Sequence, residues 1–134
     1  MSLFKEIHSV LRKGQSSMYE DLLTEIFADL LSTKKNLAGF CSSFIGETIK
    51  NPREIIINTQ KTFLRLDNHE INSRPDLVIQ FKEGDEKYVF FFENKVESLE
   101  GFNQLARYAD HLERYKDDNF QTFLFYLTKY NEVK

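Results

Sequence analysis

The stretch that decides the fold runs from Arg74 to Lys95 and reads RPDLVIQFKEGDEKYVFFFENK. Two apolar runs, Leu77–Phe81 and Tyr88–Phe92, are rich in β-branched and aromatic residues and flank a polar linker that contains Gly84. This pattern is typical of two paired strands joined by a turn. The second run is apolar at every position, which predicts a strand covered on both faces.

Charged and polar residues stand at one end of both predicted strands. Asp76 begins the first strand, directly after Pro75, and the second strand ends in Glu93, Asn94 and Lys95. Side chains alternate along a strand, so Glu93 and Lys95 share a face and Asn94 points to the other. A carboxylate at the end of a buried strand loses hydration and persists only if it is paired, metal-bound or partly wet. Two acids beside a lysine therefore indicate either a site for a hard cation or a structural ion cluster.

The pair Pro75-Asp76 and Glu93-x-Lys95 resembles the signature of the PD-(D/E)XK nuclease superfamily. The resemblance implies a metal-dependent nuclease that hydrolyses phosphodiester bonds of nucleic acid, DNA rather than RNA. It implies that Asp76, Glu93 and the backbone carbonyl of Asn94 bind Mg²⁺, or Mn²⁺ in its place. Lys95 would then orient or deprotonate the attacking water, or offset negative charge in the transition state.

A helix is expected from about Ser17 to Leu31, and it contributes a further acid. Glu20 lies on a stripe of large apolar residues at helical spacing, namely Leu23, Phe27 and Leu30. The superfamily often places an additional acidic residue on its first core helix, and the resemblance assigns this catalytic and metal-binding role to Glu20. Two alternatives stay open. Glu20 closes a capping box with Ser17, or Glu25 takes the role instead.

Another helix is expected from about Gly101 to Tyr115, after a polar connection over 96–100. Within it Gln104 and Tyr108 are four residues apart and so share a face. They resemble the Gln-x-x-x-Tyr helix that follows Glu-x-Lys in one large branch of the superfamily, which implies that both side chains face the active site and bind substrate. An amide and a phenol can bond phosphate oxygens or metal ligands without adding charge. As an isolated pair, both would be ordinary surface residues.

The remaining elements complete an α/β fold. Helices are predicted over 3–13 and 36–49, an extended run over Arg53–Leu66, a polar loop over Asp67–Ser73 and a final buried strand over Phe120–Thr128. A strand, helix and strand in succession form a parallel pair. The order is a restriction-endonuclease-like α-β-β-β-α-β core, with a mixed sheet flanked by helices and extra N-terminal helices. His69, in the polar loop, has no Cys or second His at a zinc-like spacing and is expected at the surface.

Composition limits the class of protein. The 134 residues, 41% of them hydrophobic, suit a single domain over 1–134, and the sequence ends soon after its last predicted strand, so further elements are expected in a longer protein. The lone Cys41 cannot form an internal disulfide, which favours the cytoplasm, and no apolar run is long enough to span a membrane.

The net charge of −3 argues against a protein that coats nucleic acid through bulk charge. A local basic rim can still contact phosphates, and six residues could form it or remain solvated surface charges: Lys34, Lys35, Lys50, Arg53, Lys61 and Arg65. A homodimer is expected if both strands of a duplex are cut together. The alternative function is a catalytically inactive nuclease fold that binds nucleic acid or protein.

Overall fold

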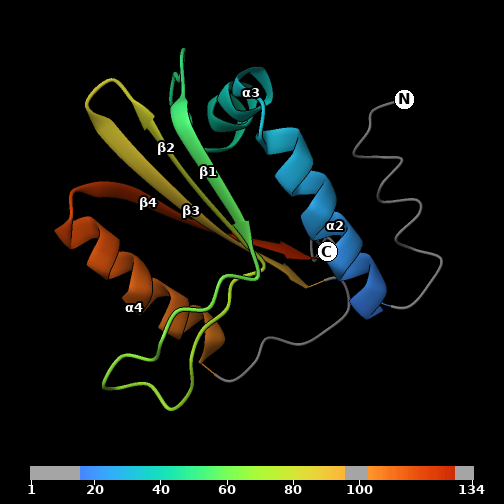
Figure 1. Ribbon diagram of the computed structural model, residues 1–134, viewed down its shortest axis with the longest axis vertical. Helices are drawn as coiled ribbons and strands as arrows, with labels where there is room; N and C mark the ends of the chain where they lie inside the picture. The colour runs from blue at the N-terminus through green and yellow to red at the C-terminus, as the bar shows by residue number, and fades with distance from the viewer. Residues whose placement is uncertain (1–15, 96–102, 129–134) are drawn as a thin grey trace, which may run out of the picture.

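The chain is described here by a computed structural model that covers residues 16–95 and 103–128, with side chains over 21–94 and 103–126. Its elements are α2 (Ser16–Leu31), α3 (Lys34–Phe44), β1 (Arg53–Thr59), β2 (Leu77–Glu83), β3 (Glu86–Lys95), α4 (Gln104–Asp117) and β4 (Phe120–Thr128) (Figure 1). The helix predicted over 3–13 lies outside these residues. Within the described ranges, no helix combines the length and apolar character that crossing a membrane requires.

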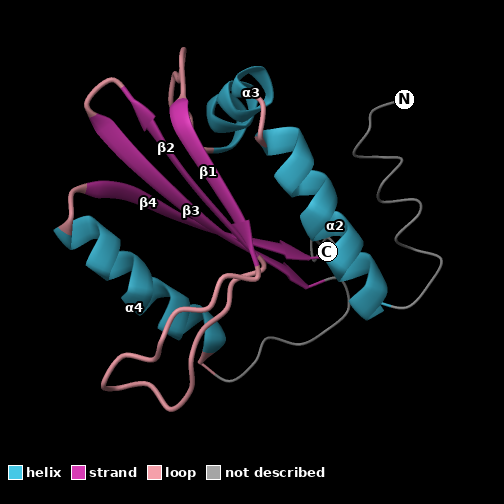
Figure 2. Ribbon diagram, in the orientation of Figure 1, coloured by secondary structure: helices cyan, strands magenta, loops and turns pink. Residues whose placement is uncertain are grey.

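The four strands form one mixed sheet in the order β1-β2-β3-β4 (Figure 2). β2 pairs antiparallel with both β1 and β3, whereas β3 and β4 are parallel, with α4 as the connection between them. This confirms the predicted helix, three strands, helix and strand of a restriction-endonuclease-like core. β3 therefore has a hydrogen-bonded neighbour on each side.

Helices cover both faces of the sheet, so β3 is enclosed in every direction. α2 and α3 lie on one face and α4 on the other (Figure 1). Phe90 and Phe92 pack into the cluster that contains residues of α2 and α3, whereas Val89 and Phe91 pack with Tyr108 of α4. All four residues of β3 are at most 1% exposed. The apolar character of both faces of β3 follows from this double cover.

Residues with a left-handed backbone conformation (positive φ) set three element boundaries that differ from those predicted from the sequence pattern. The helix predicted to reach residue 49 ends at Phe44, because Gly46 has φ of 67° and cannot continue it. The extended run ends at Thr59, because Gln60 has φ of 59°. Asn103, with φ of 58°, delays the start of α4 to Gln104.

The loop between β1 and β2 folds back against α4. Phe63 and Ser73 pair through two backbone hydrogen bonds of 2.7 and 2.9 Å, which close the loop at its base. The prediction of a surface His69 is wrong: this residue is only 6% exposed, and its Nε2 lies 2.9 Å from Oδ2 of Asp110. The polar loop sequence gave no sign of this contact, because the partner lies 41 residues away.

The buried thiol of Cys41 predicts that the free energy of unfolding depends on pH in the alkaline range. Burial, reinforced by the negative charges of Glu47 and Glu83, raises the pKa of Cys41 from 9.0 to about 12. Above pH 9 the unfolded chain loses this proton while the folded chain keeps it, so the free energy of unfolding falls as pH rises from about 9 to about 12. The slope from this one group is at most about 1.4 kcal/mol per pH unit.

We expect Cys41→Ala to remove this part of the alkaline loss of stability. Urea unfolding at several values between pH 8.5 and pH 10.5 should show wild type losing stability more steeply than the variant. Buried tyrosines are present in both proteins and cancel in the comparison. Parallel slopes would contradict the assignment of the raised pKa to this thiol.

Candidate active site

The polar ends of β2 and β3 meet at one end of the sheet. Leu77 pairs with Phe92 in the antiparallel register, so the next position sets Asp76 opposite Glu93. Opposite residues of an antiparallel pair project to the same face. The backbone N–H of Asn94 donates to Oδ2 of Asp76 at 2.7 Å, which fixes this carboxylate against the end of β3.

Two side chains of α4 hold the Glu93 carboxylate, which is only 2% exposed. The Tyr108 hydroxyl donates to Oε1 of Glu93 at 2.9 Å. Nε2 of Gln104 donates to Oε2 of Glu93 and to the Tyr108 hydroxyl, each at 3.2 Å. The expected shared face of Gln104 and Tyr108 is observed, and it is turned toward Glu93. The three groups form a closed triangle of hydrogen bonds.

Burial fixes the direction of these hydrogen bonds. Tyr108 is 1% exposed, and burial together with the charge of Glu93 raises the pKa of its phenol above the usual range. The phenol therefore keeps its proton and acts as a donor. Hydrogen bonds to a charged carboxylate are stronger than those between neutral groups, so this contact orients Glu93 firmly.

Gln60 supports the second carboxylate and was not identified from the sequence. Its backbone N–H donates to the carbonyl of Asp76 at 3.1 Å, and its Nε2 to Oδ1 of Asp76 at 3.4 Å. Its left-handed backbone costs about 1–3 kcal/mol in a residue other than glycine, and such strain often accompanies functional sites. No local pattern marks a glutamine in an extended run for this role.

Asn94 faces the opposite side of the sheet, as predicted, and connects the strand end to α2. Its Nδ2 donates to Oγ1 of Thr24 at 2.7 Å, and both residues are at most 2% exposed. Thr24 follows Glu20 by one helical turn, a spacing that could have identified it. The side chain of Glu20 lies outside the described residues, and Glu25, its alternative, is exposed.

Lys95 and the residues of the candidate basic rim lie in different parts of the structure. Lys95 ends β3 beside Thr128 of β4, and its side chain lies outside the described residues. Arg53 pairs with Lys82 and donates to the carbonyl of Gly84, at the hairpin end of the sheet far from Asp76.

At the same hairpin end, Nζ of Lys34 donates to Oδ1 of Asn51, and the backbone N–H of Lys50 donates to Oε2 of Glu83. The side chains of Lys34, Lys50 and Arg53 are exposed, so these three belong to the solvated charges. Lys61 and Arg65 lie instead on the loop beside α4.

The side chains present fit a hard cation. Among the described residues, no three or more His, Cys, Asp or Glu side chains are grouped so that they could hold a metal ion by themselves. The candidate oxygens are therefore those of Asp76 and Glu93, together with Oε1 of Gln104, which is buried without a hydrogen-bond partner in the described part of the chain. Carboxylates and amide oxygens are ligands that Mg²⁺ accepts, whereas zinc would favour nitrogen and sulfur.

Comparison with known proteins agrees with this geometry. No curated protein and no solved structure matches the sequence. Residues 9–134 match a protein family described as the PD-(D/E)XK nuclease superfamily, and the match includes every residue of the candidate site. The chain belongs to the PD-(D/E)XK nuclease superfamily.

Proposed function

We propose that this protein is a metal-dependent nuclease that hydrolyses phosphodiester bonds of DNA at the end of β2 and β3. The observation that carries the proposal is the buried Glu93 carboxylate, held by Tyr108 and Gln104 opposite Asp76. Membership of a nuclease superfamily supports a nucleic-acid substrate.

The oxygens at this end of the sheet would hold Mg²⁺ or Mn²⁺. Asp76 and Glu93 are the proposed ligands, with the backbone carbonyl of Asn94 and a contribution from Glu20. The ion would supply activation of the attacking water and compensation of charge on the phosphoryl group. The structure supports this ligand set through the fixed positions of the two carboxylates.

The neighbouring residues keep the carboxylates in place. Tyr108 and Gln104 prevent the Glu93 side chain from rotating, and the N–H of Asn94 does the same for Asp76. Groups held in advance need not reorganise during the reaction, which is the main source of electrostatic catalysis. Lys95, two residues after Glu93, is proposed to orient the attacking water or to offset charge on the phosphate.

The first test is cleavage of labelled single- and double-stranded DNA and RNA with Mg²⁺, Mn²⁺ or EDTA. We expect wild type to cut DNA only with metal, and Lys95→Ala and Asp76→Ala to lose at least about 100-fold in rate. Asp76→Ala should also abolish metal binding measured by calorimetry. Asp85→Asn is the matched control, because Asp85 is an exposed acid in the β2–β3 turn at the other end of the sheet.

Two outcomes of this experiment would contradict the proposal. If folded wild-type protein cuts no substrate under any metal condition, the chain acts as a nuclease fold that binds rather than cuts. If Lys95→Ala and Asp76→Ala retain full activity, the carboxylates and lysine form a structural cluster only.

The hydroxyl of Tyr108 provides a finer test of positioning. Tyr108→Phe removes the donor to Glu93 and preserves the ring. We expect the concentration of Mg²⁺ for half-maximal cleavage to rise about 10- to 100-fold, as is typical when a group that orients a metal ligand is lost. Tyr115→Phe is the matched control, because its hydroxyl lies on the same helix but accepts from Gln80 at 3.5 Å. An equal effect of the two substitutions would assign Tyr108 a structural role alone.

DNA as the preferred substrate, the homodimer and the cytoplasmic location stay predictions. The nucleic-acid panel tests the first, and light scattering of the protein with and without duplex tests the second. A dimer that forms only on duplex DNA would place two active sites on opposite strands.

A further inference from the structure

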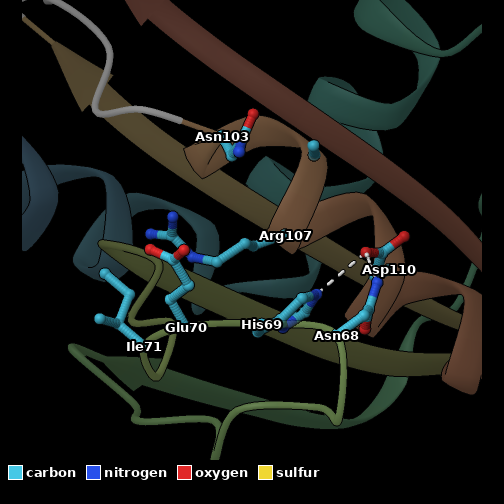
Figure 3. A pocket seen from close by; sticks show the side chains of 8 residues that line it. Asn68, His69, Glu70, Ile71, Asn103, Arg107 and Asp110 are labelled. Atoms are coloured by element: carbon cyan, nitrogen blue, oxygen red, sulfur yellow. Dashed lines mark hydrogen bonds and ion pairs between the residues drawn. The ribbon is translucent and has the colours of Figure 1, made fainter.

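A polar cavity lies beside the candidate active site. It has a volume of about 540 Å³ and lies between the β1–β2 loop and α4 (Figure 3). Asn68, His69 and Glu70 line it from the loop, and Arg107 and Asp110 line it from the helix.

His69 fixes the orientation of Asp110. Its Nε2 donates to Oδ2 of Asp110 at 2.9 Å, and its Nδ1 accepts from the backbone N–H of Leu66 at 3.4 Å. Both ring nitrogens are thus engaged, so His69 is not available as a general base. The His69 side chain is 3% exposed, whereas that of Asp110 is 45% exposed. A buried group therefore holds an open carboxylate at the cavity wall.

Asp110 presents one oxygen to a ligand. Asn68 donates to Oδ2 at 3.4 Å, the same oxygen that His69 contacts. No hydrogen bond to Oδ1 is found among the described residues. The hydrogen bond from His69 lowers the pKa of Asp110, so the carboxylate is charged at neutral pH and accepts hydrogen bonds.

The charge of the cavity selects against a phosphate. Two carboxylates, Glu70 and Asp110, face it with one guanidinium, that of Arg107. Nε of Arg107 donates to Oγ of Ser73 at 3.3 Å, which holds the guanidinium toward the loop (Figure 3). A phosphate would meet a net negative surface. A neutral group with N–H donors fits better, and a guanidinium plane can stack on a base.

The cavity is also placed to contact the same nucleic-acid strand as the active site. Arg107 directly precedes Tyr108 on α4, and Ser73 lies three residues before Asp76. A strand held at the ends of β2 and β3 would therefore pass close to the cavity. An unpaired base beside the scissile phosphate could enter it, as bases commonly do in sites that read single strands.

We propose that this cavity binds a guanine base through Oδ1 of Asp110. This inference rests on the proposed nuclease function, because the base belongs to the DNA that the nuclease would cleave. Guanine presents N1–H and N2–H donors on one edge and so suits a cavity with one carboxylate on its helix side, Asp110, and another on its loop side, Glu70. Thymine presents carbonyl oxygens on either side of its single N–H, and the carboxylates repel these oxygens. The cavity thus gives the nuclease a preference for guanine near the cleaved bond.

Binding is tested without cleavage. Imidazole resonances of the protein are followed by NMR in EDTA during titration with dGMP, dTMP or inorganic phosphate. We expect dGMP to shift the resonances of His69 and of His111, whose rings are 5.3 Å apart, and dTMP and phosphate to leave them unchanged. Asp110→Asn should weaken dGMP binding at least about fivefold, as expected when one hydrogen bond to a base is lost. Asp117→Asn, an exposed acid on the same helix, should not.

Two results would overturn the proposal. One is equal shifts with phosphate or dTMP, which would show anion binding or a site that does not read the base. The other is no shift with dGMP, or a shift that Asp110→Asn leaves intact. Because this experiment needs neither metal nor catalysis, a failure here leaves the nuclease proposal standing, and a failure of cleavage leaves this binding site standing. In an active enzyme, Asp110→Asn should also reduce guanine preference in random-sequence DNA.

Discussion

The burial of the Glu93 carboxylate at the end of β3 is the constraint on which the rest of the structure depends. β3 has strands on both sides and helices over both faces, and Glu93 at its end is only 2% exposed, so water solvates its charge poorly. The charge must be stabilised by groups that the fold brings there, and α4 supplies two of them, Tyr108 and Gln104. α4, which connects β3 to β4, therefore covers one face of the sheet and also orients the Glu93 carboxylate.

The opposite face of the same strand end is fixed by an independent contact. Asn94 bonds Thr24 of α2 through its side chain and Asp76 through its backbone N–H. Alternation along the strand thus lets two helices on opposite faces hold consecutive residues, Glu93 and Asn94. A functional group held by regular elements from both sides is positioned more accurately than one on a loop. The site needs the complete three-layer fold, not the sequence motif alone.

Sequence alone predicted the parts that follow from short-range periodicity. The alternation in β3 placed Glu93 and Asn94 on opposite faces, and the four-residue spacing placed Gln104 and Tyr108 on one face of α4. What it missed depends on single backbone conformations or on distant partners. Gln60 turns left-handed beside Asp76, and His69 is buried because the loop meets Asp110 on α4. Neither property can be predicted from the residues that are adjacent in the sequence.

The two proposals assign catalysis and recognition to different faces of α4. Gln104 and Tyr108 lie four residues apart and face the sheet, whereas Arg107 and Asp110 lie three apart and face the loop. The first pair is confined by the packed core, where a changed side chain would disturb Glu93. The second pair meets a loop, which tolerates substitution far better than a strand of the core. Under these two proposals, evolution could alter the base that the cavity accepts without moving the proposed metal ligands, because the two proposed functions share a helix but not a face.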